Sequence, residues 1–356
     1  MKEIELKAFA KINLSLDVKG LLDNGYHRVE MVMQQILLCD DVLIRWREHP
    51  LSSANRLSGS GNHTPDAGHA PSEYTKNEGK GSDVCHSDSE HTATENAKKI
   101  KISLSTDKSF LPTDKRNLAY KAALIMAERF GNELCGHIYI DIKKRIPVAA
   151  GLAGGSSNAA AVIHGLNMLW QLNLPLKELC SLGSELGSDI PFCIMGQAAA
   201  NDSLKDRFAS DPLTCHCALA TGRGTELTPV AGLKSHLVLS KPPISVSTAE
   251  VYRGIDDMKI PLHPDNAELI RGLESENLNL ISKNFVNVLE NFTLKRYPIV
   301  MYTKNILETL CGSEYVLMSG SGPTVFGLCS DPDRSKKICS EMLKHNKESF
   351  RTRTTW

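Results

Sequence analysis

The 356-residue chain lacks an excess of charge of either sign, since 41 basic residues are matched by 41 acidic ones. A neutral chain without a basic stripe argues against nucleic acid or an anionic membrane surface as the main partner. No apolar run approaches the ~20 residues of a membrane span, and the first residues lack the profile of a signal peptide. We therefore expect a cytoplasmic protein, a monomer or weak homodimer, that acts on a small molecule.

The ten cysteines are scattered, and several stand in apolar patterns, as reduced core thiols do. We therefore expect no disulfide framework. Cys215-His216-Cys217 is a weak metal signal, because no second Cys or His pair stands at zinc-like spacing. We expect no metal held by the protein alone, and Mg²⁺ only as an ion carried by a phosphate ligand.

Residues 48–100 have almost no aliphatic side chains and are dense in Ser, Gly, His, Asn and Glu. Such a segment cannot bury enough apolar surface to offset its ordering entropy, so we expect a disordered or loosely ordered insertion. Residues 201–217 read as a second, less extreme insertion. The length suits two domains, and from about residue 237 strand and helix patterns alternate, which predicts a second domain of the α+β class.

The stretch PVAAGLAGGSSNAAA, residues 147–161, combines small flexible residues with the start of an apolar helical pattern that Pro175 ends. Backbone N–H groups approach an anion closely where side chains do not intervene, and a helix N-terminus adds free donors. The glycine spacing matches neither the P-loop nor the GxGxxG pattern. A turn that only packs the helix on a strand is the alternative, but the hydroxyls of Ser156 and Ser157 favour an anion or its Mg²⁺.

The N-terminal segment has an apolar residue at every even position from Ile4 to Val18, which is typical of a strand with one buried face. Lys11 and Asn13 then share the other face, ~7 Å apart along the strand. That spacing suits two groups that converge on one ligand. An ordinary solvated strand face is the alternative interpretation.

Asp23-Asn24-Gly25 is a turn signal that predicts a hairpin, with Tyr26 and His27 at its lip. An aromatic ring beside an imidazole can stack on a heterocycle and hydrogen-bond it, although such a pair also serves packing alone.

Asp189 follows a helix predicted over residues 176–186 and ended by Gly187. It is either an Asx-turn residue or a carboxylate held at a helix exit to accept a proton. Residues 319–324 form a second glycine-rich turn between two strand-like segments. This turn either closes over phosphates or is only a hairpin, and the residues alone favour the hairpin.

Seven motifs together resemble those of the GHMP small-molecule kinases. They are AKINLSL (10–16), DNGYH (23–27), PVAAGLAGGSSNAAA (147–161), LGSDIPF (186–192), GRGTELTPV (222–230), VSTAEVY (246–252) and SGSGPTVF (319–326). The motifs follow the family order and leave out only the two insertions and the extreme C-terminus. The resemblance implies a two-domain α+β fold, with a ribosomal-protein-S5-domain-2-like domain over 1–232 and a ferredoxin-like α+β domain over 233–356.

The resemblance also implies ATP-dependent phosphorylation of a hydroxyl, and it is closest to members that act on the 2-hydroxyl of a CDP-linked methylerythritol. Asp189 matches the catalytic aspartate that takes the hydroxyl proton, and Lys11 matches the catalytic lysine beside it. The implied substrate contacts are Asn13, Tyr26, His27 and Tyr252, with the two tyrosines as walls around the cytosine. The implied ATP contacts are Pro147, Val148, Ala149, Ala150, Gly151, Leu152, Ala153, Gly154, Gly155, Ser156 and Ser157, with Lys144 and Asn117 near the adenine.

The chain departs from the family pattern at Ala149, Ala150 and Ala153, which replace glycines common in this loop. An alanine at a position that needs a positive φ would be strained by ~1 kcal/mol or more, which would weaken ATP binding.

Three alternatives to this function follow from the same residues. A GHMP kinase for a smaller alcohol, such as homoserine or mevalonate, does not need Tyr26, His27 and Tyr252. A catalytically silent nucleotide binder does not need both Lys11 and Asp189. A dinucleotide-binding oxidoreductase fails on the glycine spacing and on the missing N-terminal Rossmann unit.

Overall fold

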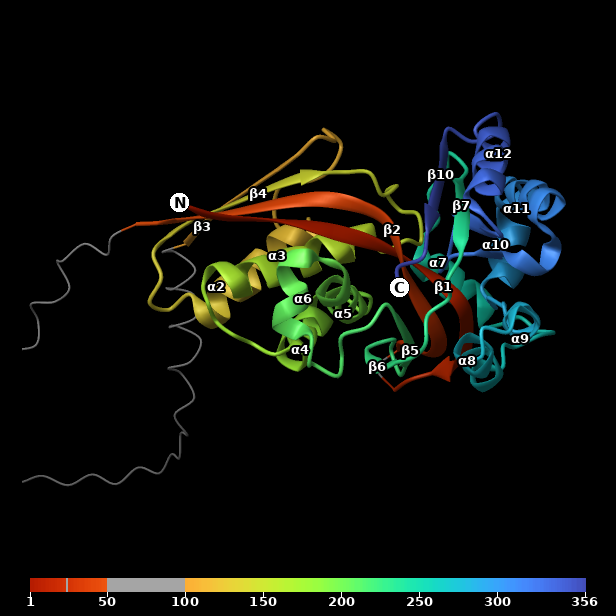
Figure 1. Cartoon of the computed structure of the whole chain (residues 1–356), viewed down its shortest axis with the longest axis horizontal. Coiled ribbons are helices and arrows are strands. Elements are labelled where there is room, and N and C mark those ends of the chain that lie inside the picture. Colours follow the sequence, from red (N-terminus) through yellow and green to blue (C-terminus); the bar gives the residue numbers. More distant parts are fainter. Residues whose placement is uncertain (24, 50–99) are drawn as a thin grey trace, which may run out of the picture.

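The computed structural model describes residues 1–23, 25–49 and 100–356, which form two β-sheets (Figure 1). The first sheet has the strand order β3-β4-β2-β5-β6, and β1 pairs with β2 off this path. Its strands are β1 (Lys2–Leu21), β2 (His27–Glu48), β3 (Ile100–Thr106), β4 (Gly136–Lys143), β5 (Cys217–Thr221) and β6 (Glu226–Pro229). The chain passes to the second sheet after β6, close to the boundary expected at residue 232.

Helices cover one face of the first sheet (Figure 1). They are α2 (Leu118–Phe130), α3 (Gly154–Leu169), α4 (Leu176–Leu186), α5 (Ile190–Ala200) and α6 (Asp202–Phe208). The predicted apolar stripe of α3 is buried, from Ala159 to Leu169, against the inner faces of β1 and β2. This packing places the glycine-rich segment before α3 against the middle of strand β1.

The hairpin is confirmed, with Leu21 opposite His27 across the predicted turn. The alternation along β1 is also confirmed, but the opposite face is not solvated. Asn13, Ser15 and Asp17 are fully buried there, because helix α8 (Asn266–Glu274) and the loop before α10 (Glu290–Arg296) cover this half of the strand. A hydrogen bond from the backbone N–H of Leu16 to the carbonyl oxygen of Val286, 2.9 Å long, ties β1 to that loop.

The second sheet has the order β10-β7-β9-β8, with every neighbouring pair antiparallel. Its elements are β7 (His236–Lys241), α7 (Thr248–Ile255), α8, α9 (Leu278–Lys283), α10 (Glu290–Arg296), α11 (Pro298–Cys311), β8 (Val316–Met318), β9 (Val325–Cys329), α12 (Pro332–Met342) and β10 (Glu348–Arg353). The last strand lies beside the first, as in the ferredoxin-like split βαβ arrangement. The α+β class of the second domain is therefore as expected.

The segment expected to be a second insertion is an ordered part of the first domain. Helix α6 occupies its first half, with Leu204 and Phe208 buried in the same core as α3. The Asn201 side chain accepts a hydrogen bond from the backbone N–H of Lys7 at 2.8 Å and donates to the Lys7 carbonyl oxygen at 3.0 Å. The predicted insertion at 48–100 lies almost wholly outside the described residues.

The nine cysteines of the described residues are free thiols. Burial raises the pKa of Cys215 to about 12 and that of Cys217 well above its ordinary value, so both thiols stay protonated and are poor metal ligands. No group of His, Cys, Asp and Glu in the described part of the chain could hold a metal ion. Among the described helices, none is both long enough and apolar enough to cross a membrane.

Candidate active site

Lys11 and Asp189 meet between strand β1 and the start of helix α5. The Lys11 side chain is buried, and its Nζ lies 3.7 Å from an Asp189 carboxylate oxygen. The same nitrogen donates a hydrogen bond to Oδ1 of Asn13 at 2.8 Å, so these two side chains converge as the strand spacing predicted. The backbone N–H of Lys11 donates to the Leu152 carbonyl oxygen at 3.2 Å, which joins the strand to the glycine-rich loop.

Asp189 follows the end of helix α4, as one of the two expectations had it, and it also stands at the entry of a second helix. Gly187 ends α4 as predicted, but Ile190 already begins α5, with Asp189 as its N-cap residue. The carboxylate makes no capping hydrogen bond, and 29% of the side chain is exposed. The Lys11 ammonium and the N-terminal end of α5 both lie beside this carboxylate. The arrangement presents a partly exposed carboxylate to a ligand.

The glycine-rich loop adopts left-handed backbone conformations at three positions. Gly151 has φ +73°, and two alanines share this region, Ala149 at +50° and Ala153 at +57°. The expected strain therefore applies to Ala149 and Ala153 but not to Ala150. No side chain caps α3, so the first N–H groups of the helix remain available as donors. This fits a phosphate group at the helix N-terminus.

The Ser157 hydroxyl does not face an anion, which corrects its predicted role. Ser157 is fully buried, and its Oγ donates to the Phe9 carbonyl oxygen at 2.7 Å. The side-chain amide of Gln197 donates to the Ser157 carbonyl oxygen at 2.8 Å and to its Oγ at 3.1 Å. The hydroxyl therefore joins α3 to β1 and α5. Ser156 is more exposed, and its role at phosphate or Mg²⁺ stays a prediction.

Lys144 lies against the start of helix α3, and its expected place near the adenine stays a prediction. Its ammonium forms a buried ion pair with Asp40 and donates to Oδ1 of Asn158 at 3.1 Å. A side chain added at Gly154 would come within 3.2 Å of the same nitrogen. The charge of Lys144 is thus committed to Asp40, and the residue supports the start of α3 from below.

Asn117 is the N-cap of helix α2, where its Oδ1 accepts from the backbone N–H of Ala119 at 3.0 Å. Its side-chain nitrogen donates to the Pro112 carbonyl oxygen at 2.9 Å. Both polar atoms serve the local fold, so the adenine contact expected from this side chain is not supported.

The second glycine-rich turn is both the β8–β9 hairpin and a contact of the first loop. Ser319 Oγ donates to the Gly151 carbonyl oxygen at 3.0 Å. A Cβ on Gly151 would lie 2.2 Å from the Ser319 carbonyl oxygen, so this contact requires glycine. The buried Asn287 donates to the carbonyl oxygens of Met318 and Gly320, at 2.8 and 2.7 Å. Sequence reasoning missed Asn287, because its partners are distant in the sequence.

His27 and Tyr252 form an aromatic pair near the Lys11–Asp189 centre. Their ring centroids are 4.9 Å apart at an interplanar angle of 42°. Nε2 of His27 lies 2.6 Å from Oδ1 of Asp256, a partner that the sequence did not reveal. Burial raises the pKa of Tyr252, and the negative charge of Asp189 raises it further. The aromatic pair therefore lies within electrostatic reach of the Asp189 carboxylate.

Tyr26 does not join this pair in the structure. Its side chain is 59% exposed, and the guanidinium of Arg223 lies 5.3 Å from the centre of its ring. Its expected place as a second wall around a base stays a prediction.

The fold and the loop geometry are those of one class of phosphotransferases. The N-terminal domain model of the GHMP kinases matches residues 117–197, and the C-terminal model of the same kinases matches residues 264–348. The first match contains the glycine-rich loop and Asp189, and the second contains the turn at Ser319. The class defined by the fold and the site is the GHMP kinases.

Comparisons over the whole chain narrow this class. A 4-diphosphocytidyl-2-C-methyl-D-erythritol kinase of Alkaliphilus metalliredigens is 40% identical over 94% of this chain and 91% of its own length. The same kinase of Geobacillus kaustophilus is 39% identical, with the same two coverages. A crystal structure titled 4-(cytidine 5'-diphospho)-2C-methyl-D-erythritol kinase has TM-score 0.68 at 22% identity, covering 99% of this chain and 100% of that one. The chain belongs to the family of 4-diphosphocytidyl-2-C-methyl-D-erythritol kinases.

Proposed function

We propose that this protein phosphorylates the 2-hydroxyl of 4-diphosphocytidyl-2-C-methyl-D-erythritol with ATP, giving the 2-phosphate and ADP in the non-mevalonate route to isoprenoids. The names of its relatives support this reaction. The observation that carries the proposal is the position of Asp189. Its carboxylate lies 3.7 Å from the Lys11 ammonium, and its charge acts on Tyr252.

Asp189 is the proposed base. As the substrate hydroxyl oxygen attacks the γ-phosphorus, Asp189 takes the hydroxyl proton, and the bond to the bridging β-phosphate oxygen breaks so that ADP leaves. Lys11 orients the carboxylate and offsets charge on the transferring group. Because Lys11 is buried and also held by Asn13, its ammonium needs little rearrangement during the reaction.

The glycine-rich loop is the proposed phosphate cradle. The uncapped N-terminus of α3 offers N–H donors and the positive end of a helix dipole. The contact between Ser319 and Gly151 lets the second domain hold the loop in this conformation. Mg²⁺ carried by ATP supplies charge neutralisation of the phosphates, and the Ser156 hydroxyl is its proposed oxygen ligand.

The His27–Tyr252 pair is the proposed cytosine site, with Asn13 as a further substrate contact. Asp256 fixes the imidazole through Nε2 and leaves Nδ1 to read the polar edge of the base. A smaller alcohol, such as homoserine or mevalonate, would leave these rings without a partner. A silent nucleotide binder has no need of the Lys11–Asp189 contact.

The test is Mg²⁺-dependent ADP release from the full chain with the CDP-linked substrate, with homoserine or with mevalonate. We expect release only with the CDP-linked substrate. Release with homoserine or mevalonate instead would assign the chain to another GHMP reaction. Binding of ATP without release in any of the three mixtures would support the silent binder.

The variant Asp189→Asn tests the base in the same assay. It removes the proton acceptor and little else, so turnover should disappear while ATP affinity stays within about twofold. The matched control is Asp202→Asn, which makes the same change in an exposed ion pair of α6 with Lys205 and should leave turnover intact. An equal loss of ATP binding in Asp189→Asn would refute the assignment.

A further inference from the structure

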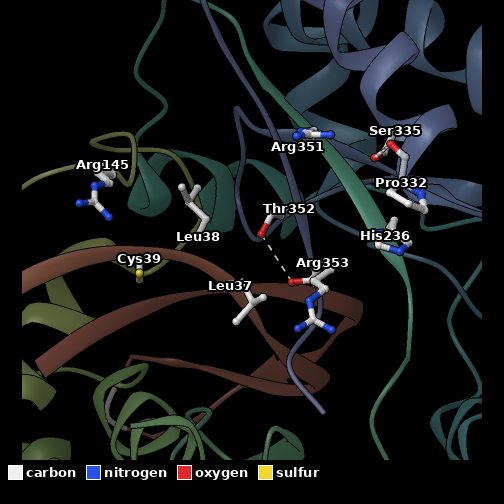
Figure 2. Close-up of a pocket in the computed structure, with 10 residues that line it drawn as sticks. All are labelled: Leu37, Leu38, Cys39, Arg145, His236, Pro332, Ser335, Arg351, Thr352 and Arg353. Atoms are coloured by element: carbon white, nitrogen blue, oxygen red, sulfur yellow. Dashed lines mark hydrogen bonds between the residues drawn. The ribbon is translucent and has the colours of Figure 1, made fainter. Parts of the chain in front are cut away.

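A cavity of about 480 Å³ lies at the junction of the two sheets, beside the edge strand β10 (Figure 2). Its walls come from β2, from the segment before the glycine-rich loop, and from β7, α12 and β10. Its volume lies within the ~300–1,000 Å³ of ligand pockets. The described residues that line it are distinct from those of the candidate active site, so the cavity requires its own explanation.

The chemical character of the cavity is basic. Four basic side chains line it, and none of its described lining residues is acidic. Arg353 and His236 are cross-strand neighbours, and the Arg353 guanidinium lies 4.4 Å from the centre of the Trp356 ring. The exposed Arg351 has no ion pair or hydrogen bond to its side chain within the part of the chain that the structure describes. A cation without a partner in a concave site favours an anionic ligand.

The opposite wall carries Arg145 and Leu38, which lie across the cavity from the residues of β10 (Figure 2). Arg145 lies 2.5 Å from Oδ2 of Asp41, whose other oxygen is 2.5 Å from the Lys7 ammonium. The Lys7 ammonium also lies 3.3 Å from Glu5, so the two cations are matched by two carboxylates and this wall carries no net charge. The N-terminal turn of α12 also borders the cavity, and its N-cap residue Asp331 already accepts from the backbone N–H of Arg334 at 2.8 Å.

An irregularity of β2 supplies the apolar part of the wall. The register of β1 on β2 shifts between Phe9 and Lys11, whose partners are Cys39 and Gln35. Three residues of β2 thus stand opposite a single residue of β1, and Leu37 is left 38% exposed at the cavity. Bulges of this kind redirect side chains and are frequent beside functional sites. An exposed leucine between arginines suits a ligand that is anionic at one end and apolar at the other.

We propose that this cavity is a second ligand site, which binds a small organic phosphate. Arg351 holds the phosphate group, and Leu37 packs against the apolar part. Arg145 is two residues before the glycine-rich segment, so an occupied site borders one element of the catalytic centre. The inference does not depend on which alcohol the active site phosphorylates.

The test is calorimetric titration of the full chain with hexyl phosphate, in the presence of a saturating non-hydrolysable ATP analogue that occupies the phosphate loop. Inorganic phosphate and 1-hexanol, each of which lacks one half of the probe, are titrated in parallel. We expect one saturable site for hexyl phosphate, weaker binding of inorganic phosphate and no binding of hexanol.

Three variants locate the site. Arg351→Gln should weaken hexyl phosphate binding at least tenfold, whereas Lys337→Gln, an exposed cation on α12 outside the cavity, should leave it within about twofold. Leu37→Ser should weaken hexyl phosphate but not inorganic phosphate. Binding that Arg351→Gln leaves unchanged, binding displaced by the ATP analogue, or no binding at millimolar concentration would each overturn the proposal. Thermal melting of each variant distinguishes lost binding from lost folding.

Discussion

The ammonium nitrogen of Lys11 lies 3.7 Å from a carboxylate oxygen of Asp189 and 2.8 Å from the amide oxygen of Asn13. The two partners reach Lys11 from different elements, since Asn13 shares its strand and Asp189 begins helix α5. A buried cation held between two oxygens is preorganised, because its side chain does not have to change rotamer before it acts. Lys11 is thus the residue that joins the strand, the helix and the loop into one site.

Replacement of Lys11 by methionine should lower kcat about 10²- to 10³-fold, the usual cost of losing one preorganised electrostatic group. The effect on KM should be small, because the charge acts on the transferring phosphoryl group. Steady-state ADP release measures both constants. Lys2→Met, at the exposed start of the same strand, is the matched control and should behave as the wild type. A rise in KM with unchanged kcat would mean that Lys11 only binds substrate.

Ala149→Gly should stabilise the protein by about 1 kcal/mol, because an alanine at φ +50° pays a left-handed backbone penalty that glycine avoids. Ala149 is exposed, so no packing is lost. Thermal and urea unfolding measure the change. Ala150→Gly is the control in the same loop. Ala150 is buried and has no positive φ, so the glycine should destabilise the fold. Equal shifts of both variants would contradict the strain.

The sequence predicted those elements whose hydrophobic pattern has a single period. The apolar periods of strand β1 and helix α3 placed both elements correctly, although in the structure each is buried on more than one face. Helix α5 was missed because it is buried almost all round and carries an apolar run without a helical period. As a result the sequence placed Asp189 after a helix, which is correct, but did not show that it also begins the next one.

The candidate site was predictable where neighbours in the sequence are also neighbours in space. The convergence of Lys11 and Asn13 follows from strand geometry alone. The contacts of Lys144 with Asp40 and of Asn117 with Pro112 could not be predicted from strand geometry, because they depend on how the loop and the strands pack. The partner of His27 belongs to the end of helix α7, and no local pattern marks Asp256 for that contact.

Replacement of residues 50–98 by a short Gly-Ser linker should leave folding and activity intact. Glu48 at the end of β2 and Ile100 at the start of β3 both pair with Gly136 of β4. Their separation is therefore two strand spacings, about 10 Å, which a linker of about six residues spans with ease. The measurements are the thermal unfolding transition and ADP release. A collapsed transition would show that the replaced segment is structural.

Protonation of His164 should make the protein less stable in acid. His164 on α3 is fully buried, and its Nε2 donates to the Ile194 carbonyl oxygen of α5 at 2.9 Å. Burial lowers the pKa of this imidazole from 6.5 to about 4. Between these values the unfolded chain binds a proton that the folded chain does not, so stability falls as the pH falls through this window. The loss should reach about 2 kcal/mol at pH 5 relative to pH 8.

The variant His164→Gln separates this titration from the packing of the helix. Its amide can still donate to Ile194, but it has no proton to gain, so the stability difference between pH 8 and pH 5 should shrink by about 2 kcal/mol. Urea unfolding at both pH values measures the difference. The control is His137→Gln. Burial and nearby Lys101 lower the pKa of His137 as well, but this histidine is on β4 and takes no part in the α3–α5 contact. If both variants changed the pH dependence equally, the acid sensitivity would not come from the α3–α5 contact.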